Sequence, residues 1–133
     1  MRIFTGGIEL INTEGMLQSA ISTLREAEVL GFDTETRPSF KRGEFHKVAL
    51  VQFAFENRVF LIQIHKTGVS EELARILSDS KIVKAGVAIR DDIKGLQKFH
   101  RFQPNGFIDL SVMARENGIE VESVKKLTAL KLI

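Results

Sequence analysis

Two acidic side chains at the end of an apolar segment could together bind a metal ion. The segment runs from Val29 to Glu35, with the sequence Val-Leu-Gly-Phe-Asp-Thr-Glu. Residues two apart on a strand point to the same side, so Asp33 and Glu35 would lie next to each other. Two adjacent carboxylates repel each other and resist losing water unless a cation lies between them, and magnesium prefers oxygen ligands. The alternative is a solvated turn after a core strand.

A second acidic pair follows another apolar segment. Residues 81–87 are typical of a strand that runs into a glycine, and Asp91 and Asp92 come shortly afterwards. Apolar residues spaced by three and four predict a helix that begins near Asp91. The alternative is helix-start chemistry, with Asp91 as cap and Asp92 near the positive end of the helix dipole. That explanation suits one aspartate better than two. If both strands share a sheet, one of these aspartates could face Asp33 and Glu35.

Three segments carry a family resemblance. They are Gly31–Thr36, Lys47–Gln52 and Lys84–Asp92. In this order and at these separations they resemble the 3′–5′ exonucleases of the ribonuclease D and Werner-syndrome helicase type, from about Val29 to the end of the chain. The resemblance implies an α/β fold with a ribonuclease-H-like mixed sheet, in which an antiparallel meander precedes parallel strands and helices cover both faces. It also implies hydrolysis from the 3′ ends of DNA or RNA with two Mg²⁺ or Mn²⁺ ions.

The resemblance assigns catalytic and metal-binding roles to three acids. Asp33 and Glu35 match the first exonuclease motif, whose carboxylates hold the ions, and Asp92 best matches the acid of the second motif. Asp91 is the neighbouring candidate for that second position. In a two-ion site, one ion activates water and the other stabilises the leaving oxygen.

Residues in and next to the first two motifs are candidates for contact with nucleic acid, and two further residues match structural positions of the family. The nucleic-acid candidates are Thr34, Lys41, Arg42, Arg90 and Lys94. For the four basic residues the alternative is ordinary solvated surface, because a phosphate backbone needs cations but no particular sequence. Gln52 and Asp109 match family positions that we interpret as structural.

The family's third motif is not found in this chain. That motif places a tyrosine or histidine a few residues before a fourth carboxylate. The chain has no tyrosine, and none of its three histidines is followed by an acid five residues later. We therefore expect residues 1–133 to be a single exonuclease domain that lacks its C-terminal third-motif helix and is inactive as it stands. The alternatives are a catalytically dead nucleic-acid-binding relative and a structural module of the same fold.

The elements that would position these residues alternate between strand and helix. Strands are predicted at 8–11, 29–33, 48–55, 58–64, 82–86 and 107–110, and helices after Asn12 or Thr13, after Ser70, and at 91–99 and 111–117. Glu56-Asn57 predicts a tight hairpin turn, and Gly118 is typical of a helix end. Alternation of strands and helices in the second half favours parallel pairing.

Composition indicates one intracellular domain. The chain has 133 residues and no cysteine, so it predicts no disulfide framework. No apolar run is long enough to span a bilayer, and the start lacks a signal-peptide pattern. We expect a cytoplasmic protein without membrane contact. The net charge of +2 is too small to argue for nucleic-acid binding by itself. The sequence does not distinguish a DNA substrate from an RNA substrate. It also does not indicate the oligomeric state or a helicase partner.

Overall fold

A six-stranded mixed sheet forms the centre of the molecule. The computed structural model describes residues 7–36 and 47–118, so Lys41, Arg42 and the segment expected to precede the third motif lie outside the described residues. The strand order is β1-β4-β3-β2-β5-β6. The strands are β1 (Gly7–Ile11), β2 (Val29–Thr36), β3 (Val48–Phe55), β4 (Arg58–Ile62), β5 (Val83–Gly86) and β6 (Phe107–Asp109).

The pairing confirms the expected meander followed by parallel additions. β2, β3 and β4 pair antiparallel, whereas β1 lies parallel to β4, β5 parallel to β2, and β6 parallel to β5. The β3–β4 hairpin turns at Glu56, which takes a φ of 53°. A side chain at Gly86 would collide with the Phe32 carbonyl, so glycine is what lets β5 end close against β2.

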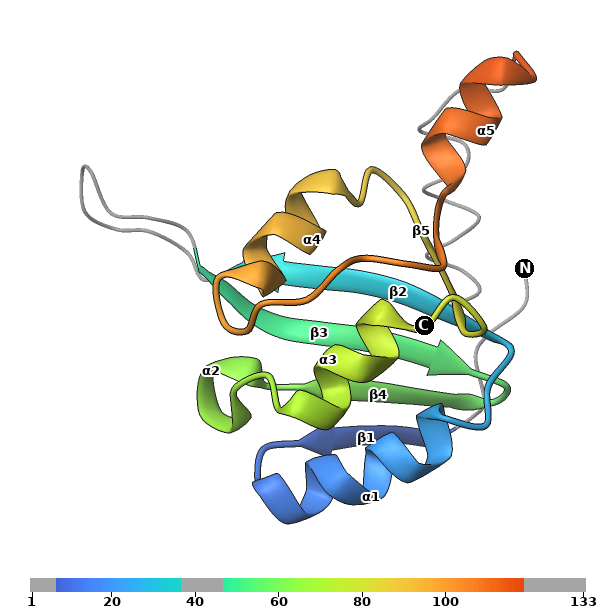
Figure 1. Ribbon diagram of the computed structural model, residues 1–133. Helices are drawn as coiled ribbons and strands as arrows, with labels where there is room; N and C mark the ends of the chain where they lie inside the picture. Colours follow the sequence, from blue (N-terminus) through green and yellow to red (C-terminus); the bar gives the residue numbers. More distant parts are fainter. Residues whose placement is uncertain (1–6, 37–46, 119–133) are drawn as a thin grey trace.

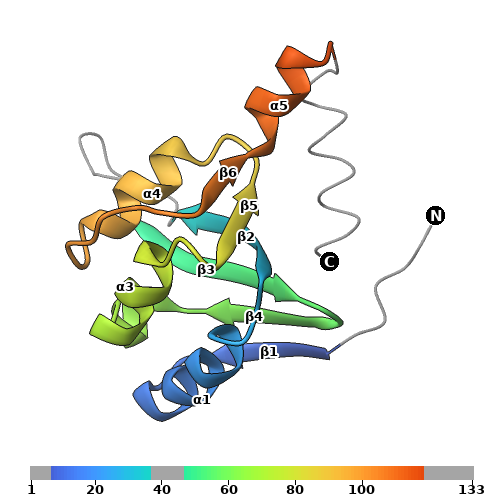
Figure 2. The same ribbon diagram turned by 45° about the vertical axis from the view of Figure 1, so that its right-hand side comes forward.

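Three of the described helices cover one face of this sheet, and α5 (Leu110–Glu116) projects beyond it (Figure 2). The other described helices are α1 (Glu14–Leu24), α2 (Ile64–Thr67), α3 (Glu71–Ser78) and α4 (Arg90–Gln97). In Figures 1 and 2, α1, α3 and α4 lie on the same side of the sheet. Three right-handed crossovers that all advance in one direction along the sheet require this arrangement. A helix on the other face, as the resemblance implies, is not among the described elements and stays a prediction.

Local sequence explains where most helices begin. The Thr13 hydroxyl accepts a hydrogen bond from the Met16 amide (3.2 Å), and the Ser70 hydroxyl accepts one from the Leu73 amide (3.1 Å). Ser70 is the N-cap that the sequence predicts, and Thr13 is one of the two candidates, Asn12 or Thr13, for the first helix. At α4, however, the N-cap is Ile89, without a side-chain hydrogen bond, so Asp91 does not cap the helix.

One helix was not predicted from the sequence. The strand expected at 58–64 ends at Ile62, and the short helix α2 follows. Its Ile64 is fully buried, which explains why an apolar residue continues the pattern after the strand has ended.

The core lies between the sheet and the helices. Phe32, Phe53 and Phe60 from β2, β3 and β4 are each at most 1% exposed, and the Phe32 ring lies 5.9 Å from that of Phe53. Burying a side chain of this size contributes on the order of 1.5–3 kcal/mol. Among the described residues, no helix is long and apolar enough to cross a membrane.

Lys84 is a fully buried cation within this core. Its Nζ donates hydrogen bonds to the carbonyls of Ile76 and Asp79, each at 2.8 Å, at the C-terminal end of α3. It also lies 5.2 Å from the centre of the Phe107 ring. Burial lowers the pKa of Lys84 to about 8, although the Asp79 charge opposes this. The side chain thus ties β5 to α3.

Candidate functional site

The end of β2 sends neighbouring side chains to opposite faces of the sheet. Phe32 and Thr34 are buried on the side that the helices cover, whereas Asp33 is partly buried and Glu35 exposed. The alternation is the one expected of a strand, and it puts the two acids on the same face. Burial raises the pKa of Asp33, and the Glu35 charge adds to the rise, while a hydrogen bond from the Thr34 amide opposes it.

The second acidic residue reaches the site from the first turn of α4. The Thr34 hydroxyl donates a hydrogen bond to Oδ1 of Asp92, which joins α4 to β2. Burial raises the pKa of Asp92, and the negative charge of Asp33 contributes further. The two aspartates are therefore close enough to disfavour each other's ionised form.

This geometry changes the interpretation of two residues. Thr34 is 8% exposed and its hydroxyl holds Asp92, while its contact with nucleic acid stays a prediction. Asp91 is exposed and lines a cleft with Arg90 and Lys94. The geometry favours Asp92 over Asp91 as the partner of Asp33.

The side chains of the site include oxygen ligands that suit a hard divalent ion, but the three predicted ligands do not lie together. Within residues 7–36 and 47–118, no three acidic, histidine or cysteine side chains gather closely enough to hold a metal. Asp33 and Asp92 still offer the oxygen ligands that Mg²⁺ and Mn²⁺ prefer, and their raised pKa values indicate negative charge that a cation would neutralise. Glu35 would join them only from a different side-chain position.

Gln52 is a neighbour of Asp33 that the sequence did not reveal. The β2–β3 register pairs Asp33 with Gln52. Directly opposite residues have Cβ atoms about 4.5–5.5 Å apart on the same face. The structural role that the family resemblance implies for Gln52 stays a prediction, and the register adds that Gln52 lies beside Asp33.

Asp109 acts as an internal anchor, in agreement with its expected structural role. Its carboxylate accepts hydrogen bonds from the amides of Ala88 (3.0 Å), Ile89 (3.2 Å) and Ser111 (2.9 Å), and from the Ser111 hydroxyl (2.5 Å). Burial acts to raise the pKa of Asp109, but these hydrogen bonds outweigh it and the pKa is lowered. They hold Ala88 at a φ of 53°, directly before α4.

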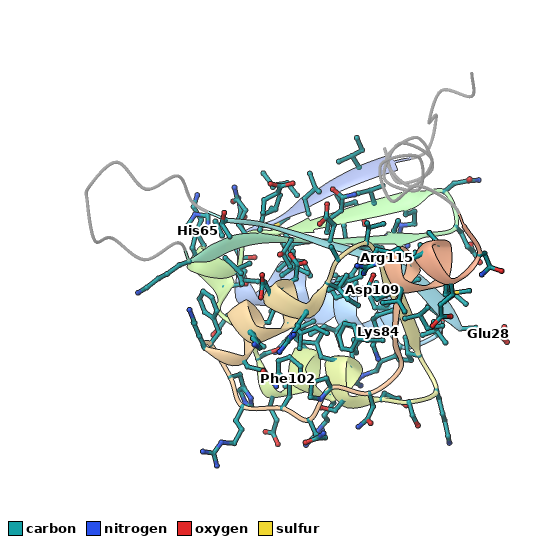
Figure 3. All side chains as sticks on the ribbon, turned by 90° about the horizontal axis from the view of Figure 1, so that it is seen from above. Glu28, His65, Lys84, Phe102, Asp109 and Arg115 are labelled. Atoms are coloured by element: carbon teal, nitrogen blue, oxygen red, sulfur yellow. The ribbon has the colours of Figure 1, made fainter. Side chains whose placement is uncertain are left out.

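Two of the predicted basic residues border a cleft beside the acids. Arg90 and Lys94 lie on α4, and the cleft wall across from them includes Arg115 of α5. Figure 3 labels Asp109 and Arg115, which both line this cleft at the junction of β6 and α5. Arg115 carried no motif signal in the sequence, because only the fold brings α5 beside α4.

Comparison with known proteins gives a consistent result. A family model described as 3′–5′ exonuclease matches residues 8–131. The bifunctional 3′–5′ exonuclease/ATP-dependent helicase WRN of Mus musculus is 32% identical over 95 residues, which are 70% of this chain. The chain spans only 7% of the length of that mouse protein.

Solved structures of exonucleases share the fold. Ribonuclease D of Trypanosoma brucei, in complex with the RNA U12, has a TM-score of 0.70 at 22% identity, covering 82% of this chain and 39% of that one. The EXD2 exonuclease domain soaked in Mg and GMP has a TM-score of 0.67 at 23% identity, covering 81% and 58%. These TM-scores show that the chain shares the fold of these exonuclease structures.

Proposed function

Because the chain belongs to the 3′–5′ exonuclease family, we propose that it removes nucleotides from the 3′ ends of DNA or RNA in a reaction that requires Mg²⁺ or Mn²⁺. Asp33, Glu35 and Asp92 would be the catalytic and metal-binding residues. One observation carries this proposal: Thr34 hydrogen-bonds two partly buried aspartates, Asp33 at the C-terminal end of β2 and Asp92 in the first turn of α4, and both have raised pKa values.

Each residue has a role that its position supports. Asp33 and Asp92 would hold the divalent ions, with Glu35 as a further ligand. When bound, such ions lower the pKa of water and neutralise charge on the phosphate. The buried Thr34 hydroxyl keeps Asp92 turned toward β2. Arg90 and Lys94 would contact the phosphate backbone, which positions a strand without reading its sequence.

The test is hydrolysis of 5′-labelled single strands of DNA and of RNA, in Mg²⁺, in Mn²⁺ and in EDTA. We expect shortening from the 3′ end that is slow in the 133-residue chain, that occurs only with a divalent ion, and that is lost in Asp33→Asn and Asp92→Asn. Glu28→Gln is the matched control, because Glu28 is an exposed acid immediately before the other end of β2. Cleavage in EDTA, or shortening from the 5′ end, would contradict the proposal.

A second candidate is a relative that binds nucleic acid without cleaving it. It is favoured by the lack of a three-ligand group within the described residues and by the lack of any tyrosine in the chain. A tyrosine that positions the attacking water would act in general acid–base catalysis, which contributes about 10²–10⁴ in rate. Without it, the 133-residue chain is expected to hydrolyse nucleic acid slowly at best. Strand binding with no hydrolysis at high Mn²⁺ would select this candidate. A cytoplasmic location stays a prediction from composition.

A further inference from the structure

A basic cleft separates α4 from α5 next to the acidic site. Its volume is about 500 Å³, and it takes residues from the β5–α4 connection, from α4 and from the start of α5. Its lining includes Ala88, Arg90, Lys94, Ser111, Val112 and Arg115. Arg90 and Lys94 are four residues apart and therefore lie on one face of α4, whereas Asp92 lies on another.

Positive charge dominates the cleft. Arg90, Lys94 and Arg115 all line it, and the two ion pairs found among the described residues, Glu9–Arg58 and Glu71–Arg75, lie elsewhere. Of the two acids in the lining, Asp109 already accepts four hydrogen bonds from the protein. Asp91 alone is left to oppose three cations. An anion is thus the ligand that the charges fit.

Arg115 is oriented before any ligand arrives. Its Nε donates to the Ser111 carbonyl (3.3 Å), and Nη2 lies 3.4 Å from the Ser111 hydroxyl. A guanidinium has five N–H donors in a planar fork, so three of them are left over from these contacts. Such a fork matches the geometry of a phosphate group. Ser111 is in turn held by Asp109, which also fixes Ala88 across the cleft floor.

We propose that this cleft binds a backbone phosphate of the nucleic-acid strand whose 3′ end lies at Asp33 and Asp92. The inference rests on the proposed function and deepens it, because it gives the strand a path from the end of β2, across α4, to Arg115. A phosphate group contacted by Arg90, Lys94 and Arg115 holds the strand in place beside the acids. The contact is independent of base identity and of the divalent ions.

The experiment measures binding without catalysis. Fluorescence anisotropy of labelled 12-nucleotide DNA and RNA single strands is recorded in EDTA at several KCl concentrations. Each neutralised phosphate contributes about 0.7 to the slope of log affinity against log salt for single strands. Arg115→Gln should make that slope shallower by about 0.7 and weaken binding about three- to five-fold at low salt. Arg115→Lys should restore part of the affinity.

Arg101→Gln is the matched control. Arg101 is an exposed arginine that lines a different pocket, beside α3, and its substitution removes the same charge. Equal losses in Arg115→Gln and Arg101→Gln would overturn the proposal, because net charge alone would then explain the binding. Arg115 bonds only within its own helix in the described structure, so the variant should melt at an unchanged temperature.

Two further experiments distinguish free phosphate from a strand phosphate, and the cleft assignment from the proposed exonuclease function. If inorganic phosphate raises the melting temperature of wild type but not of Arg115→Gln, while strand affinity is equal in both, the cleft holds free phosphate and the strand path is wrong. Asp33→Asn should abolish hydrolysis yet bind strands in EDTA as wild type does. Arg115-dependent strand binding without any hydrolysis would contradict the proposed function and leave the cleft assignment standing.

Discussion

The buried Lys84 makes a quantitative prediction about how stability depends on pH. Its pKa of about 8 in the folded chain, against 10.5 for the free side chain, corresponds to a free-energy difference of about 3 kcal/mol. The unfolded chain holds this proton up to higher pH than the folded chain does, so folding is penalised below pH 8. Stability should therefore rise between about pH 8 and 10.5 as the folded lysine loses its proton. A neutral amine keeps two N–H donors, enough for the Ile76 and Asp79 carbonyls.

Lys84→Met isolates this contribution. Urea unfolding of wild type and variant at pH 7, 8, 9 and 10 gives the difference between their free energies of unfolding at each pH. We expect that difference to shift in favour of wild type by about 2–3 kcal/mol from pH 7 to 10, while the other lysines cancel. At pH 7 the variant loses two hydrogen bonds but also avoids burying a charge, so its stability at that single pH is not diagnostic. The change of the difference with pH is what tests the lowered pKa of Lys84. Parallel curves for the two proteins would refute the reasoning.

Two predictions concern the acids. Asp33→Asn should be at least as stable as wild type at neutral pH, because the raised pKa of Asp33 means that its stability contribution falls as pH rises above the usual carboxyl range. Millimolar Mn²⁺ should raise the melting temperature of wild type and not that of the variant, because an ion at ten times its dissociation constant stabilises the folded state by about 1.4 kcal/mol. Asp109→Ala should cost about 1–3 kcal/mol at pH 7 in urea unfolding, because it leaves the Ile89 and Ser111 amides unpaired. Since the pKa of Asp109 is lowered, that cost should shrink as pH falls below about 4, and a pH-independent cost would contradict this.

Local sequence patterns predict most of the helices and strands, but they do not predict which side chains meet between elements. Alternating burial in β2 and the caps Thr13 and Ser70 follow from patterns within a few residues, so they could be read directly. The hydrogen bond from Thr34 to Asp92 joins residues 58 apart and depends on how α4 docks. The sequence likewise did not predict that Arg115 lines the cleft, because this depends on how α5 lies relative to α4. Periodicity specifies which face of an element is buried, not which element it meets.

The position of β1 has a consequence for how the chain folds. Among the described strands β1 comes first in sequence, yet its one partner there is β4, so that Ile11 lies opposite Ile62. The hairpins β2–β3 and β3–β4 close over shorter stretches of chain, and loop-closure entropy favours such contacts early. We expect the meander to form first and β1 to dock late. Ile8 and Leu10 are 60% and 46% exposed, so this edge gains little from burial and should open first in hydrogen exchange. The strand that comes first among the described elements would then be among the last to become stable.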